Sequence, residues 1–146
     1  MHIFISYSRK DSDFANHLCK LLNDNRLPYF IDKADILPGA IWRDDLRRAV
    51  QQSFALIVIM TENSQKSDWV QKEIAYARER RIRILPILHF GKVWPNLENL
   101  NYIEMQEASY AQLPSQMLQS LQEAYTDYKK RSAKGWVSWR LGLITV

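Results

Sequence analysis

A carboxylate follows a tryptophan by four residues in the segment from Ser67 to Ala77. If this segment is helical, with Ser67 as its N-cap, the Glu73 carboxylate and the Trp69 indole share one face. Glu73 also falls on the flank of an apolar stripe, about 100° from Ile74, so we expect its side chain to lie half out of water. A carboxylate beside an aromatic wall can bind a sugar or a cation, although most charged residues on helices are simply solvated.

A loop rich in hydroxyls and cations follows the strand-like run at residues 2–6. It contains Arg9 and Lys10, and the next helix is expected to begin at Asp11 or Ser12. Cationic side chains and free backbone amides at a helix start can bind a phosphate group. This loop is therefore a candidate phosphate site.

A second loop combines a stiff turn at Pro38 and Gly39 with the apolar side chains of Ile36 and Leu37. Apolar side chains exposed on a stiff loop indicate a lid or a contact surface.

Short apolar runs rich in Ile, Val and Phe alternate with helical patterns along the chain. Such runs are typical of strands buried in a parallel sheet, and the helical patterns are typical of crossover helices that cover it. The expected strands occupy residues 2–6, 28–32, 54–60, 83–88 and, more weakly, 100–103. The sequence therefore predicts an α/β fold, whose ligands bind at the carboxyl ends of the strands.

Several classes of site are disfavoured by the motifs of the chain. Neither a Gly-x-Gly-x-x-Gly nor a Gly-x-x-x-x-Gly-Lys-Ser/Thr sequence occurs, so dinucleotide and P-loop binding lack their usual loops. His2, His17 and His89 are scattered without the spacing of a metal site, so we expect neither a metal nor a cofactor. The single cysteine, Cys19, can form no internal disulfide, and no signal peptide is evident, which together indicate the cytoplasm.

The formal charge of +4 comes largely from the end of the chain. The basic residues there are Lys129, Lys130, Arg131, Lys134 and Arg140, which we expect to lie beyond the folded body. Without them the body is close to neutral. The internal basic cluster at residues 78–83 is expected to be a solvated helix end, so we expect no nucleic-acid partner.

The expected organisation is a domain at residues 1–128 followed by a tail at residues 129–146. The tail begins as a basic linker and ends in an apolar run that contains Trp136 and Trp139. A bilayer needs about 20 apolar residues, more than this run offers, but the pattern is similar to the cytoplasmic approach to a membrane helix. The tail therefore either leads to a membrane segment or further domain, or packs back on the body.

Three segments taken together resemble the Toll/interleukin-1 receptor (TIR) family, particularly its bacterial members. They run from Ile3 to Asp11, from Asp35 through Gly39 to Trp42, and from Ser67 to Glu73. The resemblance covers residues 1–128. It implies a flavodoxin-like three-layer sandwich with a five-stranded parallel sheet.

The resemblance implies an enzyme that cleaves NAD+ between nicotinamide and ribose. It makes Glu73 the catalytic carboxylate and Trp69 part of the pocket wall. Trp94 falls where enzymatic members stack an aromatic on nicotinamide, although a place in the core is comparably plausible for this residue. The other substrate-binding residues that it implies are Phe4, Ser6, Tyr7 and Ser8 at the border of the site, and Arg9 and Lys10 near phosphate. The loop through which TIR domains associate would be formed by Asp35, Ile36, Leu37, Pro38 and Gly39.

Two functions remain open at this point. The first is an NAD+ glycohydrolase, activated by self-association in bacterial immunity or signalling, that releases nicotinamide with ADP-ribose or a cyclic isomer. The second is a non-enzymatic adaptor that recruits other TIR domains. A partly buried acid at Glu73 favours the enzyme, because an adaptor does not need one. Phosphotransfer of the response-regulator type is disfavoured, because Ser6 and Tyr7 stand where it would need an aspartate.

Overall fold

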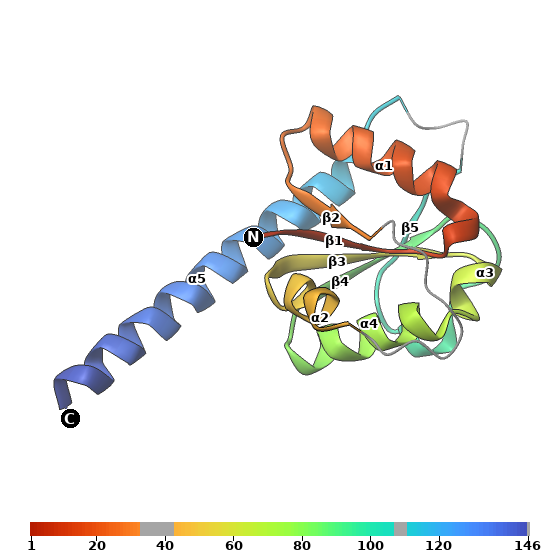
Figure 1. Ribbon diagram of the computed structural model, residues 1–146. Helices are drawn as coiled ribbons and strands as arrows, with labels where there is room; N and C mark the ends of the chain where they lie inside the picture. Colours follow the sequence, from red (N-terminus) through yellow and green to blue (C-terminus); the bar gives the residue numbers. More distant parts are fainter. Residues whose placement is uncertain (33–42, 107–110, 146) are drawn as a thin grey trace.

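The computed structural model describes residues 1–32, 43–106 and 111–145, with side chains as far as residue 133. Within these residues, five strands form a parallel sheet in the order β2-β1-β3-β4-β5 (Figure 1). They are β1 (His2–Ser6), β2 (Tyr29–Ile31), β3 (Ser53–Met60), β4 (Arg83–Leu88) and β5 (Ile103–Glu104). The flavodoxin-like α/β fold predicted from the sequence is confirmed, and β5 begins at the last residue of its expected range.

Helices cover both faces of the sheet (Figure 1). Helices α1 (Ser12–Asp24) and α5 (Ser115–Thr145) pack on one face, and α2 (Asp44–Gln51) and α4 (Asp68–Glu79) pack on the other. Three single-turn elements, η1 (Arg9–Asp11), α3 (Glu62–Gln65) and η2 (Pro95–Leu97), lie in the connections. The described part of the domain is therefore a three-layer sandwich, as predicted.

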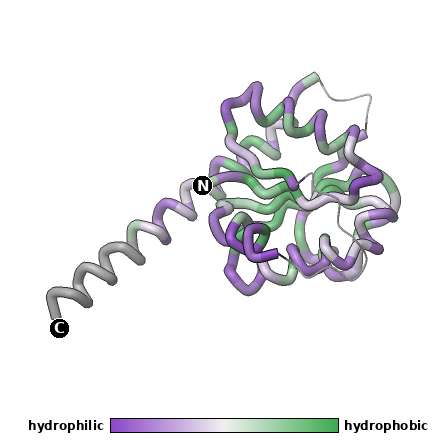
Figure 2. Tube along the Cα trace, in the orientation of Figure 1, coloured by the Kyte–Doolittle hydropathy of each residue, from purple (hydrophilic) through white to green (hydrophobic). Residues whose placement is uncertain are grey.

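The central strand β3 explains why the apolar runs are continuous. All eight of its residues are buried, because both faces of the sheet are covered. Ile57 and Ile59 pack against α1 and α5, whereas Leu56 and Val58 pack toward α2 and α4. The apolar residues accordingly concentrate in the strands (Figure 2). Burial of each such side chain contributes roughly 1.5–3 kcal/mol.

The topology places a switch point at the carboxyl ends of β1 and β3. The chain leaves β1 toward β2 on one side and later returns to β3 on the other side. A crevice opens outside the strand ends where connections diverge in this way, and it is the usual ligand position in open α/β sheets.

The last helix differs from the sequence-based expectation. Helix α5 runs without a break from Ser115 to Thr145, so most of the expected linker and tail is helical (Figure 1). Arg131 Nη1 donates a hydrogen bond to the Arg81 carbonyl at 2.7 Å. The expectation that the basic residues lie beyond the folded body is therefore wrong for Arg131, and the domain boundary at residue 128 stays a prediction. No helix among the described residues combines the length and apolar content that crossing a bilayer requires.

Candidate active site

Helix α4 holds Glu73 near the carboxyl end of β1. The helix begins at Asp68 because Ser67 caps it, its hydroxyl accepting a hydrogen bond from the Val70 amide at 3.3 Å. Val70 and Ile74 point into the core, as the apolar stripe predicts. Glu73 follows on the flank of this stripe.

Glu73 is buried more deeply than the sequence predicts. Its residue is only 8% exposed, rather than half out of water. Helical spacing gives the angular position of a side chain but not what covers it. Here α4 packs against β1, β3 and β4, and Ser6 at the end of β1 is completely buried. The flank of the helix is therefore covered by the end of the sheet.

Burial makes the Glu73 carboxyl group weakly acidic. Removal from water raises its pKa from 4.5 to about 8. The Ser6 hydroxyl and the Arg9 guanidinium favour the charged form, while the negative charge of Asp32 disfavours it. The Ser6 hydroxyl lies close enough to the carboxyl group to influence its pKa, but neither Ser6 Oγ nor Glu73 Oε2 forms a hydrogen bond of regular geometry with a described residue. The carboxyl group thus lies in a largely dry position with an unused acceptor.

Asp32, which follows β2, forms ion pairs with two arginines near the site. Its Oδ1 lies 3.1 Å from Arg43 Nη2, and its Oδ2 lies 3.9 Å from Arg9 Nη2. The Tyr7 hydroxyl donates to the Asp32 carbonyl oxygen at 2.9 Å. Burial is the main cause that raises the pKa of Tyr7, so this side chain remains a neutral hydrogen-bond donor.

Asp32 and Arg43 were both missed as site residues by sequence reasoning. A usable signal existed for Asp32, which ends the second expected strand and so occupies the usual ligand edge of a parallel sheet. Arg43 offers no such signal, because Asp32, with which it pairs, lies eleven positions earlier in the sequence.

The loop after β1, which is the candidate phosphate site, is hydrogen-bonded to the end of β3. Thr61 Oγ1 donates a hydrogen bond to Asp11 Oδ2 at 2.6 Å. Thr61 and Ser64 also form a reciprocal capping box at the start of α3. The Ser8 hydroxyl accepts from the Lys10 amide at 3.3 Å, while the Lys10 side chain is exposed. The loop after β1 is thereby held over the switch point with a cation facing solvent.

The aromatic residues predicted for the site have different positions. Trp69 is partly exposed, and the Lys72 ammonium lies 5.7 Å from its ring centroid. Phe4 is 1% exposed and stacks on Phe30, with 5.4 Å between ring centroids, so it supports the site from below. Trp94 is also 1% exposed and belongs to the core beneath α2 and α4. Its ring offers no open face for stacking, so the structure gives it a packing position.

Two further predictions concern the surroundings of the site. The association loop at Asp35, Ile36, Leu37, Pro38 and Gly39 lies outside the described residues. Within the described residues, His, Cys, Asp and Glu form no cluster that could hold a metal ion.

Comparison with known proteins identifies the family. The family described as "TIR domain" matches residues 3–118. The chain belongs to the TIR domain family. This match includes all three segments on which the sequence-based resemblance rests.

Two relatives show the kinds of protein to which this chain is similar. The "TMV resistance protein N" of Nicotiana glutinosa is 28% identical over 97% of this chain. A "Putative cyclic ADP-D-ribose synthase TIR2" of Cytobacillus dafuensis is 30% identical over 53% of this chain. The matched regions are only 12% and 22% of these two proteins, so the chain corresponds to a small part of each.

Solved structures share the fold. The TIR domain of the Toll-related receptor TRR-2 from Hydra magnipapillata has a TM-score of 0.60 and 23% identity, over 70% of this chain and 82% of that chain. The TIR domains of the activated Roq1 resistosome, which recognises the effector XopQ, have a TM-score of 0.53 and 22% identity, over 66% and 60%.

Proposed function

We propose that this TIR domain cleaves NAD+ between nicotinamide and ribose, with Glu73 as the catalytic carboxylate. The observation that carries the proposal is the buried Glu73 carboxyl group, which has a pKa of about 8 and an Oε2 without a hydrogen-bond partner among the described residues. A strongly perturbed acid in such a position destabilises a fold, and such groups concentrate at functional sites. The relative named as a putative cyclic ADP-ribose synthase supports this reaction class.

The chemistry requires only one carboxylate. In NAD+ the nicotinamide nitrogen is cationic, and the C1′–N bond breaks with its electron pair going to that nitrogen. The leaving group departs neutral and needs no proton, unlike the leaving group of an ordinary glycoside. Positive charge meanwhile develops on the ribose, where the ionised Glu73 stabilises it.

The raised pKa of Glu73 gives substrate binding a second role. With a pKa of about 8, most Glu73 carboxyl groups are protonated at neutral pH before NAD+ binds. The nicotinamide cation favours the ionised form of a carboxyl group beside it, so binding draws the proton away. The Arg9 guanidinium then binds the diphosphate of NAD+. Asp32 orients this guanidinium, with 3.9 Å between Asp32 Oδ2 and Arg9 Nη2.

The fate of the ribose carbon depends on the nucleophile. Attack by water gives ADP-ribose and a proton, whereas attack by an adenine nitrogen or a ribose hydroxyl of the same molecule gives a cyclic product. Self-association of TIR domains would activate the site and fix its geometry. The structural likeness to the TIR domains of an activated resistosome supports this part of the proposal.

The direct test follows nicotinamide release from NAD+ by chromatography. We expect concentrated or tethered wild-type protein to release nicotinamide, and Glu73→Ala to release it at least a hundredfold more slowly. Glu79→Ala is the matched control, because Glu79 is an exposed glutamate on the same helix. Equal rates for wild type and Glu73→Ala under forced assembly would overturn the proposal and leave the adaptor function.

A further inference from the structure

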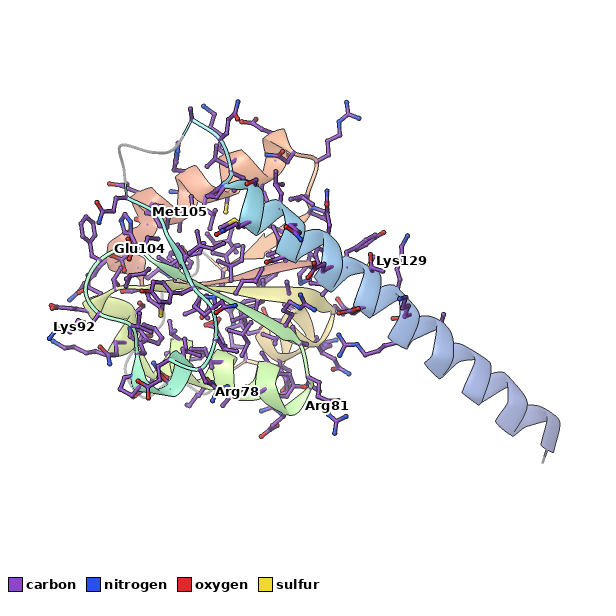
Figure 3. The ribbon with its side chains drawn as sticks, turned by 180° about the vertical axis from the view of Figure 1, so that it is seen from behind. Arg78, Arg81, Lys92, Glu104, Met105 and Lys129 are labelled. Carbon is purple, nitrogen blue, oxygen red and sulfur yellow. The ribbon has the colours of Figure 1, made fainter. Side chains whose placement is uncertain are left out.

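A groove of about 690 Å³ lies at the opposite end of β4 from the NAD+ site. Its walls come from the end of α4, the beginning of β4, the connection before β5 and the middle of α5. Figure 3 shows Arg78 and Arg81 at this end of the molecule. The groove floor is apolar, formed in part by Ile82, Ile84 and Leu100.

The side chains around this floor are mostly cationic. Two distant basic segments meet here because Arg131 on α5 binds the carbonyl of Arg81. One carboxylate, Asp127, lines the groove. The cations that line it are Arg78, Arg81, Arg83, Lys130 and Arg131.

Not all of these charges are compensated within the protein. Arg83 is neutralised, with Nη2 at 2.8 Å from Asp127 and Nη1 at 3.2 Å from Glu123. Among the described residues, Arg78 binds only the neutral carbonyl of Asn96, so its charge is not balanced by that contact. The side chains of Arg81 and Lys130 have no partner among the described residues.

Two further cations are sequence neighbours of residues that line the groove. Arg80 lies over the Tyr76 ring, 5.2 Å from its centroid, and Lys129 lies over the Tyr125 ring at 4.6 Å. The exposed Glu79 provides one nearby negative charge. The surface around the groove therefore has a clear excess of positive charge above an apolar floor.

We propose that this groove binds the phosphate headgroup of an anionic phospholipid and docks the domain on a membrane surface. Clusters of four to eight Lys and Arg next to a membrane-spanning helix or on an amphipathic helix are typical of sites for anionic lipids. The uncompensated cations match the phosphate, and the apolar floor matches the glycerol and first methylenes below it. The proposal is independent of NAD+ cleavage, since the groove and Glu73 lie at opposite ends of the sheet.

The continuation of α5 favours a lipid over a nucleic acid. Beyond the basic turn at residues 129–131, the helix continues into sequence that contains Trp136 and Trp139 and then becomes apolar. Tryptophans and apolar residues after a basic cluster are typical of helices at the membrane interface. Binding of a nucleic acid does not require an apolar, tryptophan-containing extension of the helix.

The test measures cosedimentation of the full chain with vesicles. The probes are vesicles of phosphatidylcholine alone and vesicles in which about a third is phosphatidylserine. The groove variant combines Arg81→Gln with Lys130→Gln. The control variant combines Lys66→Gln with Lys92→Gln, which removes the same charge from exposed positions at the other end of the domain. Figure 3 shows Lys92 far from Arg81. Circular dichroism establishes that all three proteins are folded.

We expect wild type to bind the anionic vesicles, to bind phosphatidylcholine much less, and to lose binding at high salt. The groove variant should bind about 25-fold more weakly, and the control variant should change no more than about threefold. Equal losses in both variants would overturn the assignment to the groove. Equal binding to both kinds of vesicle would show insertion of the tail alone and also overturn it. Groove-dependent binding to a labelled oligonucleotide, with no vesicle binding, would replace the lipid with a nucleic acid.

Discussion

Replacement of Glu73 by glutamine should stabilise the fold, and increasingly so as the pH rises. The folded protein holds the Glu73 proton up to a pH of about 8, whereas the unfolded chain releases it near the ordinary value of 4.5. Between these values the folded state binds one more proton than the unfolded state. A raised pKa of this kind gives stability that is complete below 4.5 and is lost as the pH rises through about 8.

The size of the effect follows from the two pKa values. One bound proton corresponds to about 1.4 kcal/mol for each pH unit, so the full interval from 4.5 to about 8 amounts to about 5 kcal/mol. Glutamine has nearly the same shape and does not titrate. The free energy of unfolding of Glu73→Gln should therefore exceed that of wild type by a margin that grows by about 1.4 kcal/mol per pH unit in the middle of this interval.

Urea denaturation followed by circular dichroism measures this margin at about pH 5, 6, 7 and 8. Groups common to both proteins, such as His2, whose pKa is lowered mainly by burial, cancel in the difference. Glu79→Gln serves as the control, because an exposed glutamate should give a difference that does not change with pH. A constant difference between wild type and Glu73→Gln would refute the reasoning, as would a margin that shrinks when the pH is raised.

Four further substitutions test the surroundings of the site. Asp32→Asn removes a negative charge that raises the pKa of Glu73, so Glu73 should ionise at a lower pH in this variant. In the same denaturation series, the fall of the free energy of unfolding with rising pH should therefore end at a lower pH than in wild type. Thr61→Val removes the hydroxyl that ties the loops after β1 and β3 together, and should lower the free energy of unfolding by about 1–2 kcal/mol in urea denaturation; an unchanged midpoint would contradict this. Trp94→Ala should destabilise the fold by about 3–5 kcal/mol because Trp94 is buried, whereas Trp69→Ala should slow nicotinamide release with a smaller loss of stability. The opposite pattern for the two tryptophans would return Trp94 to the site.

The elements were predictable because their signals are local. The uninterrupted apolar run of β3 reflects burial on both faces, and Ser67 marks the start of α4 by its ability to cap a helix. Together with the loop after β1, these elements also place Glu73 at the correct end of the sheet. The place of the candidate site in the fold could therefore be predicted from the sequence, while the roles of its residues stay predictions.

The depth and charge of the site were not predictable, because they arise from contacts between distant segments. Glu73 is buried by the end of β1, and its pKa depends on Asp32, forty-one positions earlier. The basic groove likewise requires Arg131 to reach Arg81 across fifty residues. Residue spacing within one helix carries no information about such contacts. For the same reason Trp94, in an irregular loop, could not be assigned to either the site or the core.

The most direct test of the proposed mechanism is the pH dependence of kcat/KM for nicotinamide release by tethered wild-type and Glu73→Gln proteins. If ionised Glu73 acts at the ribose, wild-type kcat/KM should rise about tenfold per pH unit below about 8 and level off above it, since this parameter reports the free enzyme. The glutamine variant should be at least a hundredfold slower on the plateau and should lose this dependence. A variant that keeps the wild-type rate, or that keeps the rise near pH 8, would contradict the assignment of Glu73 as the catalytic carboxylate.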